Sequence, residues 1–113
     1  MTGYEAGDIV LVPFPFGERA GGMKRPALVL SPSDFNQATG ELVIAQITSR
    51  STAAPRPGDY RIEGWQEAGL PRPALVRARL ATLKTSLVLR RLGTLSDAEC
   101  QNARTTLSGA VLG

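Results

Sequence analysis

The sequence contains no histidine and only one cysteine, Cys100. A single cysteine excludes an intramolecular disulfide, and with no histidine present it argues against a zinc site built from nitrogen and sulfur ligands. The missing histidine also removes the usual general base near neutral pH, so hydrolytic chemistry has to use arginine, threonine, a carboxylate or the substrate itself. The sequence therefore argues against a zinc enzyme, and it indicates no other cofactor.

Long hydrophobic runs and targeting signals are also missing. No stretch approaches the length of a transmembrane helix, and residues 1–6 lack a basic region followed by an apolar run. We expect a cytoplasmic protein with no membrane contact. The 113 residues, 42% of them hydrophobic, predict a single domain spanning residues 1–113 with one core.

Acidic residues are absent between Glu67 and Asp97, although the net charge of the chain is only +3. Six cationic residues fall in this stretch: Arg72, Arg77, Arg79, Lys84, Arg90 and Arg91. They predict a surface region with a positive field, which could follow the phosphates of a nucleic acid. The alternative is that they are solvated charges at strand edges and turns, where they discourage aggregation.

Apolar residues recur mainly with a period of two, in short runs separated by glycine and proline. The pattern predicts strands over residues 8–14, 27–31, 42–48, 59–62, 74–80 and 87–92, a mobile loop over 17–22, a connection over 33–40, a loop over 51–58 and a helical turn over 65–69. Ser96-Asp97-Ala98-Glu99 is a capping box that starts a C-terminal helix, followed by an apolar stripe of Cys100, Ala103, Leu107, Ala110 and Val111. The pattern predicts a mainly β fold, a small barrel of five to seven short strands with a C-terminal α-helix.

Arg25 and Thr48 are the strongest candidates for a functional site. Arg25 opens a buried strand in Lys24-Arg25-Pro26-Ala27-Leu28-Val29, and Thr48 closes the next strand in Ile44-Ala45-Gln46-Ile47-Thr48-Ser49. If these strands are neighbours, a guanidinium and a hydroxyl converge at one end of the sheet. A permanently charged guanidinium beside a hydroxyl donor can bind and polarise a phosphodiester, which favours nucleic acid as the ligand and cleavage as the activity. From the residues alone, the alternative is an exposed edge charge and a strand-terminal threonine.

Four motifs, in this order and spacing, resemble the MazF/PemK/Kid family of toxins. They are Gly7-Asp8-Ile9-Val10-Leu11-Val12, Arg25-Pro26-Ala27-Leu28-Val29-Leu30, Ile47-Thr48-Ser49, and Thr82-Leu83-Lys84-Thr85-Ser86 leading to Leu92-Gly93-Thr94-Leu95-Ser96. The resemblance covers residues 7 to about 111. It implies an SH3-like barrel of the CcdB/PemK type that acts as the homodimeric toxin of a type II toxin–antitoxin pair.

The resemblance also implies an activity and partners. Family members cleave single-stranded RNA at short sequences without a metal, and mRNA is the expected substrate. The ribose 2′-OH attacks the adjacent phosphorus and leaves 2′,3′-cyclic phosphate and 5′-OH ends. A cognate antitoxin silences the toxin by covering the RNA groove, and operator DNA is contacted only through the toxin–antitoxin complex. The family's catalytic arginine and threonine fall on Arg25 and Thr48, and its mobile loop beside the substrate falls on residues 16–24.

Seven further residues are candidates for substrate binding: Glu18, Lys24, Asn36, Gln46, Arg77, Arg79 and Lys84. Glu18 is either the proton acceptor or a solvated loop charge. Lys24 could contact a phosphate. The amides of Asn36 and Gln46 could read a base edge or satisfy backbone groups.

Two other functions remain open on the same scaffold. CcdB toxins share the barrel but bind and inhibit DNA gyrase, using apolar and aromatic residues at the C-terminus. This chain ends Ser108-Gly109-Ala110-Val111-Leu112-Gly113 without an aromatic residue. A non-cleaving regulator that binds the antitoxin and nucleic acid is the other alternative.

Overall fold

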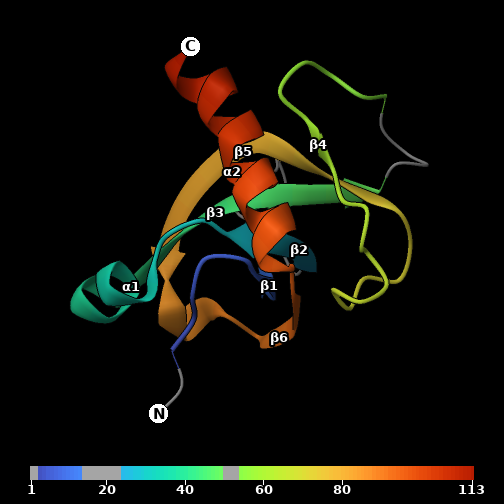
Figure 1. Ribbon diagram of the computed structural model, residues 1–113. Helices are drawn as coiled ribbons and strands as arrows, with labels where there is room; N and C mark the ends of the chain where they lie inside the picture. Colours follow the sequence, from blue (N-terminus) through green and yellow to red (C-terminus); the bar gives the residue numbers. More distant parts are fainter. Residues whose placement is uncertain (1–2, 14–23, 50–53) are drawn as a thin grey trace.

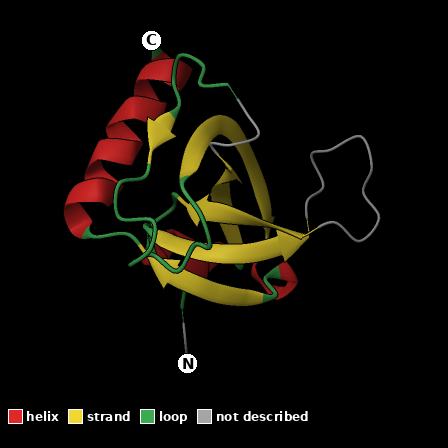
Figure 2. Cartoon of the chain, turned by 90° about the vertical axis from the view of Figure 1, so that its right-hand side faces the viewer, coloured by secondary structure: helices red, strands yellow, loops and turns green. Residues whose placement is uncertain are grey.

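The computed structural model describes residues 3–13, 24–49 and 54–113 (Figure 1). In this part of the chain six strands form one antiparallel sheet in the order β4-β5-β3-β2-β1-β6. The strands are β1 (Asp8–Pro13), β2 (Lys24–Val29), β3 (Glu41–Ser49), β4 (Tyr60–Arg61), β5 (Ala74–Lys84) and β6 (Arg90–Thr94). The sheet curls into a half-barrel with helix α2 (Asp97–Leu112) against it (Figures 1 and 2). The prediction of a mainly β, barrel-type fold with a C-terminal helix is confirmed.

The central strands β1, β2 and β3 are buried on both faces. Successive side chains of a strand point to opposite faces, so a continuous apolar run fills two apolar clusters at once. One cluster, which includes Ile9, Leu28 and Ile47, packs with Ala103 and Leu107 of α2. The other, on the opposite face, contains Val10, Val12, Ala27, Val29, Leu42, Ile44 and Leu83. The apolar runs in the sequence therefore place these strands in the middle of the sheet.

Strand β5 is longer than the sequence predicts. It pairs with β3 from Ala74 to Lys84, but the register shifts between Ala45 and Ile47 of β3. Before the shift Val76 belongs to the cluster under α2, and after it Leu83 belongs to the opposite cluster. The irregularity breaks the alternation on which the prediction of a strand over 74–80 depended.

Two other predicted segments are wrong. Residues 33–40 are not only a connection, because they contain helix α1 (Ser33–Thr39), which ends at Gly40 in the left-handed conformation with a φ of 71°. A helix this short shows little periodicity, and a long-range contact holds it: the Asn36 amide donates to the Tyr4 and Ser31 carbonyls at 2.8 and 3.0 Å. The predicted strand over 87–92 begins later, as β6, after a 3₁₀ turn at Thr85–Leu87.

Helix α2 begins where the capping box predicts. Ser96 Oγ accepts a hydrogen bond from the Glu99 N–H at 3.2 Å, which is half of the expected box. The Glu99 carboxylate does not reach back to residue 96, because it accepts hydrogen bonds from the Tyr60 hydroxyl and from the N–H groups of Glu63 and Gly64. Ala103 and Leu107 are buried, whereas Val111 is 53% exposed, so the buried stripe is shorter than predicted. Neither described helix has the length and apolar character needed to cross a membrane.

Candidate functional site

The structure makes β2 and β3 neighbours, which is the condition under which the sequence brings Arg25 and Thr48 together. Their register pairs Ala27 with Gln46 and Leu28 with Ala45. Two residues further along this register, Arg25 comes opposite Thr48. Residues directly opposite each other on antiparallel strands project from the same face. The guanidinium and the hydroxyl therefore share one end of the sheet.

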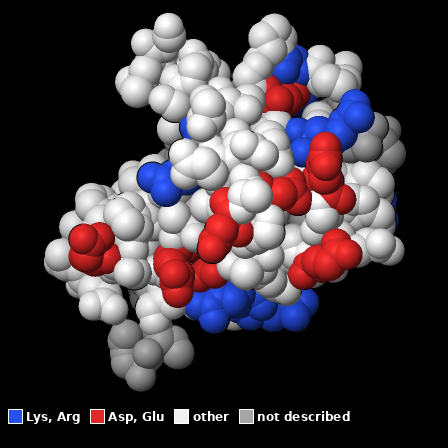
Figure 3. Space-filling model, in the orientation of Figure 1, with Lys and Arg blue, Asp and Glu red and all other residues white. Residues whose placement is uncertain are grey.

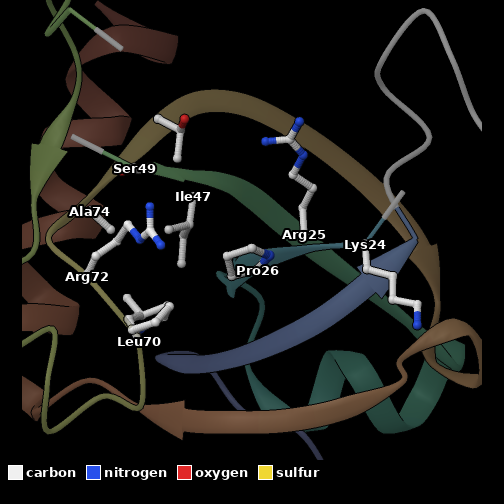
Figure 4. Close-up of a pocket in the computed structure, with 10 residues that line it drawn as sticks. Lys24, Arg25, Pro26, Ile47, Ser49, Leu70, Arg72 and Ala74 are labelled. Atoms are coloured by element: carbon white, nitrogen blue, oxygen red, sulfur yellow. The ribbon is translucent and has the colours of Figure 1, made fainter. Parts of the chain in front are cut away.

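Arg25 and Thr48 line a pocket of about 390 Å³. Its walls come from the start of β2, the end of β3 and the segment that leads into β5. Ten described residues line it: Lys24, Arg25, Pro26, Ile47, Thr48, Ser49, Leu70, Pro71, Arg72 and Ala74. In Figure 4, Arg72 lies on the side of Leu70 and Ala74, Arg25 lies on the other side, and Ile47 and Pro26 lie between them.

The lining combines positive charge with an apolar floor. Three of the described lining residues are cationic, two carry hydroxyl groups, and none is acidic. Such a pocket favours an anionic ligand, because no described carboxylate in it competes for the cations. The other five lining residues are apolar, which favours a ligand that also has an apolar part. A negatively charged group attached to a flat or apolar group fits both features.

The wall that carries Leu70 and Arg72 is held by a close backbone contact. Gly69 has a φ of +85°, and a Cβ atom built on it would lie 2.1 Å from the Leu92 carbonyl oxygen. A Cβ atom on Gly93 of β6 would lie 2.1 Å from the Ala68 carbonyl oxygen. The two backbones therefore approach more closely than any side chain allows. Because Ala68 and Leu70 are also buried, this wall is fixed to the sheet.

The Glu99 carboxylate fixes the chain just before this wall. Its oxygens accept from the Glu63 N–H at 3.0 Å and the Gly64 N–H at 2.6 Å, as well as from the Tyr60 hydroxyl. Burial alone would raise the pKa of Glu99, but these hydrogen bonds outweigh it and hold the pKa below its ordinary value of 4.5. Burial and the neighbouring carboxylate raise the pKa of Tyr60 above its ordinary value of 10.0. Glu99 is thus ionised and Tyr60 neutral near pH 7.

Glu99→Gln should make the free energy of unfolding less dependent on pH under acidic conditions. A depressed carboxyl pKa stabilises the fold above the unfolded-state value of 4.5, and that stability is lost as the pH falls through the lower folded-state pKa. We expect the free energy of unfolding of the wild type to drop below about pH 4.5 more steeply than that of Glu99→Gln, measured by urea denaturation at several pH values. A dependence on acid pH remains in both proteins, because the pKa of Asp59 is also lowered. Parallel profiles would contradict this role of Glu99.

Lys24 and Gln46 are the further candidates that lie nearest the pair. Lys24 lines the pocket, although its side chain extends away from Arg25 in Figure 4. Gln46 lies two residues before Thr48 on the same strand and is buried. Its Oε1 accepts from Arg79 Nη1 at 3.4 Å, so Arg79 is the described residue that orients this amide.

Arg77, Lys84 and Asn36 are not brought to the pocket. Arg77 pairs with Asp59 through two contacts, Nε–Oδ1 at 3.1 Å and Nη2–Oδ2 at 2.9 Å, and donates to the Ala54 carbonyl at 2.8 Å. It therefore holds a loop in place and does not present a free charge. Lys84 pairs in register with Glu41, at the opposite end of β3 from Thr48. The Asn36 amide satisfies backbone groups, the structural one of its two predicted roles.

Glu18 and the predicted loop over 17–22 lie outside the described residues. The cations of the acid-free stretch are spread over the segment before β5, β5 itself and β6, and three strands separate β5 from β6 in the sheet order. In Figure 3 lysine and arginine side chains gather along β6, which carries Arg90 and Arg91, while acidic side chains form several separate clusters above it. The described residues contain no group of three or more histidine, cysteine, aspartate or glutamate side chains that could hold a metal ion.

Sequence reasoning missed Arg72 and Ser49 as pocket residues. Ser49 directly follows Thr48, and its hydroxyl could have been included on that ground alone. Arg72 was counted only as one of six cations. Its position between Pro71 and Pro73 was the signal, because two prolines restrict the backbone that carries the side chain.

Comparisons with known proteins agree on one family. Residues 5–110 match the family described as PemK-like, MazF-like toxin of type II toxin–antitoxin system. MazF from Deinococcus radiodurans in crystal form I has a TM-score of 0.77 and 26% identity, covering 100% of both chains. The MazE–MazF complex of the same organism in form II gives 0.75 and 25%, covering 98% of this chain and 97% of that one. An endoribonuclease bound to its cognate antitoxin, from a mycobacterial species, gives 0.74 and 20%, covering 98% and 95%. No curated protein matches by sequence.

Proposed function

The chain belongs to the PemK-like, MazF-like toxins of type II toxin–antitoxin systems, and from this premise we propose that it is an endoribonuclease that cleaves single-stranded RNA without a metal. The observation that carries the proposal is the pocket that Arg25 and Thr48 line together. Support comes from the full-length similarity to Deinococcus radiodurans MazF and from the structural likeness to the mycobacterial endoribonuclease. mRNA is the proposed substrate.

The proposed reaction uses the nucleophile that RNA itself carries. The 2′-oxygen loses its proton and attacks the adjacent phosphorus, while the bond from phosphorus to the 5′-oxygen breaks and that oxygen gains a proton. The products are a 2′,3′-cyclic phosphate and a 5′-OH. DNA has no 2′-OH, so this reaction accounts for a preference for RNA.

Arg25 and Thr48 have distinct roles in this reaction. Negative charge develops on the non-bridging oxygens as the 2′-oxygen adds to phosphorus. Arg25 stabilises that charge through two parallel N–H donors, and the Thr48 hydroxyl donates a third hydrogen bond. A guanidinium donates hydrogen bonds but offers no acceptor, so Arg25 acts electrostatically and does not serve as the base.

Incubation of the purified protein with a long single-stranded RNA in EDTA tests the proposal. We expect discrete cuts whose fragments end in 2′,3′-cyclic phosphate and begin with 5′-OH, read by sequencing and end-specific ligation. Arg25→Ala purified in the same way is the control against a contaminating nuclease. The absence of cuts, or equal cutting by both proteins, would contradict the proposal.

We further propose that the toxin forms a homodimer and binds an antitoxin protein. The MazE–MazF complexes of a similar protein support the antitoxin. Apolar side chains exposed on the chain, among them Leu87 at 48% and Leu89 at 50%, leave surface for such contacts. Light scattering at micromolar concentration should give twice the mass of one chain. The mass of a single chain would contradict the dimer.

A further inference from the structure

We propose that Arg72 and the apolar floor of the pocket bind the base of one unpaired nucleotide next to the phosphate held by Arg25 and Thr48. The base lies against the exposed apolar surface of Pro26, and the Arg72 guanidinium stacks on its open face. Arg72 is then a base-binding residue that contributes to the choice of cleavage site. This inference rests on the proposed ribonuclease function and adds the subsite that recognises one nucleotide.

The composition of the pocket exceeds what a phosphate needs. A phosphodiester gains from Arg25, Thr48 and Ser49, but it gains nothing from an apolar surface. Yet half of the described lining residues are apolar: Pro26, Ile47, Leu70, Pro71 and Ala74. Ile47 and Ala74 are almost fully buried and support the floor from below, whereas Pro26 and Pro71 keep apolar surface exposed to a ligand. The volume of about 390 Å³ is in the range of small-ligand sites, which leaves room for a base beside the phosphate.

Arg72 differs from the other arginines on this side of the sheet. The Arg77 guanidinium is engaged by Asp59, and Arg79 donates to Gln46. Within residues 3–13, 24–49 and 54–113, Arg72 forms no hydrogen bond or ion pair, and its side chain is exposed at the pocket. A planar guanidinium without a carboxylate partner can stack on a nucleobase, as arginine does in the recognition of single-stranded RNA.

The geometry also places the two arginines of the pocket apart. Arg25 comes from β2, whereas Arg72 comes from the segment between Gly69 and β5, and Figure 4 shows the two on different sides of Ile47 and Pro26. One phosphate held by Arg25 and Thr48 therefore leaves Arg72 for a neighbouring group of the same RNA. That group is a base, because the floor between the two arginines is apolar.

The wall of the pocket that carries Arg72 is in place before RNA binds. It is fixed by the contact of Gly69 with the Leu92 carbonyl and by the buried side chain of Leu70, and prolines flank Arg72 on both sides. Little ordering of the wall is then required on binding, which favours affinity. A pocket with a fixed wall also distinguishes bases by size.

The contact between Arg72 and the base is tested by changing the protein and the RNA, separately and together. Cleavage sites are first mapped with the wild type. Binding is then measured by fluorescence anisotropy on an RNA whose cleavage-site ribose lacks the 2′-OH, with each base near the cut removed in turn as an abasic nucleotide. For wild type we expect removal of one particular base to weaken binding about tenfold. Arg72→Ala should bind the intact RNA about tenfold more weakly and should not respond to removal of that base.

Arg72→Lys and Arg90→Ala make the test specific. Lysine keeps the charge but cannot stack, so Arg72→Lys should resemble Arg72→Ala and should relax the base preference at that position of the mapped sites. Arg90→Ala removes an exposed charge on β6 and should leave the response to the abasic RNA unchanged. If lysine restores full binding, or if Arg72→Ala weakens all RNAs equally with a shallower salt dependence, Arg72 contacts phosphate and the inference is overturned.

The outcomes separate this inference from the proposed function. If the wild type cleaves RNA and Arg72→Ala responds to abasic RNA as the wild type does, the base subsite is wrong and the ribonuclease stands. If the wild type does not cleave single-stranded RNA, the proposed ribonuclease function is wrong, and the base subsite that rests on it is rejected as well.

Discussion

Arg25→Ala should lower the rate of RNA cleavage by about a hundredfold to a thousandfold, the loss usually seen when one donor to a developing oxyanion is removed. The guanidinium supplies charge and two parallel N–H donors at the point where negative charge develops, and no water molecule replaces both. Single-turnover cleavage of a short RNA that contains one mapped site measures the effect on the chemical step. Arg25→Lys should also be strongly impaired, because lysine keeps the charge but loses the paired donors.

Variants of Thr48 separate the hydroxyl from the shape of its side chain. Thr48→Val keeps the size and removes the donor, so it should lose most of the activity, whereas Thr48→Ser keeps the donor and should retain it. Arg90→Ala controls for a change of net charge. Valine at position 48 with wild-type activity would exclude the hydroxyl from the reaction.

Growth inhibition by the same variants distinguishes the classes of toxin. A ribonuclease should lose toxicity in Arg25→Ala and Thr48→Ala. Equal toxicity of wild type and both variants would instead indicate a toxin that acts by binding, such as one that inhibits DNA gyrase.

Gly69→Ala should destabilise the fold by on the order of 3 kcal/mol, from backbone strain and overpacking together. A Cβ atom at this position would meet the Leu92 carbonyl oxygen at 2.1 Å, and the φ of +85° is unfavourable for any residue with a side chain. Domains of this size are stable by only about 5–15 kcal/mol, so the loss is a large fraction of the total. Urea denaturation followed through the fluorescence of Trp65 measures the free energy of unfolding.

Two other glycines provide matched controls. Gly40 also has a positive φ, of +71°, but no neighbouring atom lies within 4 Å of its Cβ position, so Gly40→Ala isolates the strain and should lose about 1–2 kcal/mol. Gly109 lies within α2 with open space around it, and Gly109→Ala should stabilise the protein by about 0.5–1 kcal/mol. If Gly69→Ala loses no more stability than Gly40→Ala, the backbone contact does not hold the pocket wall.

Part of the candidate site was readable from the sequence. Two apolar runs close together in the chain predicted two buried strands, and the structure shows that these strands, β2 and β3, are neighbours. A short connection between buried strands favours such antiparallel pairing. The catalytic roles of Arg25 and Thr48 stay predictions, since they depend on chemistry that the fold alone does not test.

The partners of the charged side chains could not be predicted from the sequence. From the sequence, Arg77 and Lys84 were candidates for substrate binding and Arg72 was not, yet Arg77 pairs with Asp59 and Lys84 lies at the far end of β3. Of these three residues, only Arg72 lines the described pocket with Arg25 and Thr48. The sequence does not show which residue a charged side chain pairs with, because that partner lies on whichever strand or loop the curled sheet brings near.

The sequence by itself determined the family, through four motifs in order along the chain. It also determined the buried central strands and the start of the C-terminal helix, because each of these depends on side chains within a few positions of one another. The tertiary structure alone decided which residues surround the pocket and what fixes its walls. Glu99 bonds to Tyr60, 39 residues away, and Gly69 meets β6 through its backbone. Such contacts follow from the curvature of the sheet, and no local pattern of residues encodes that curvature.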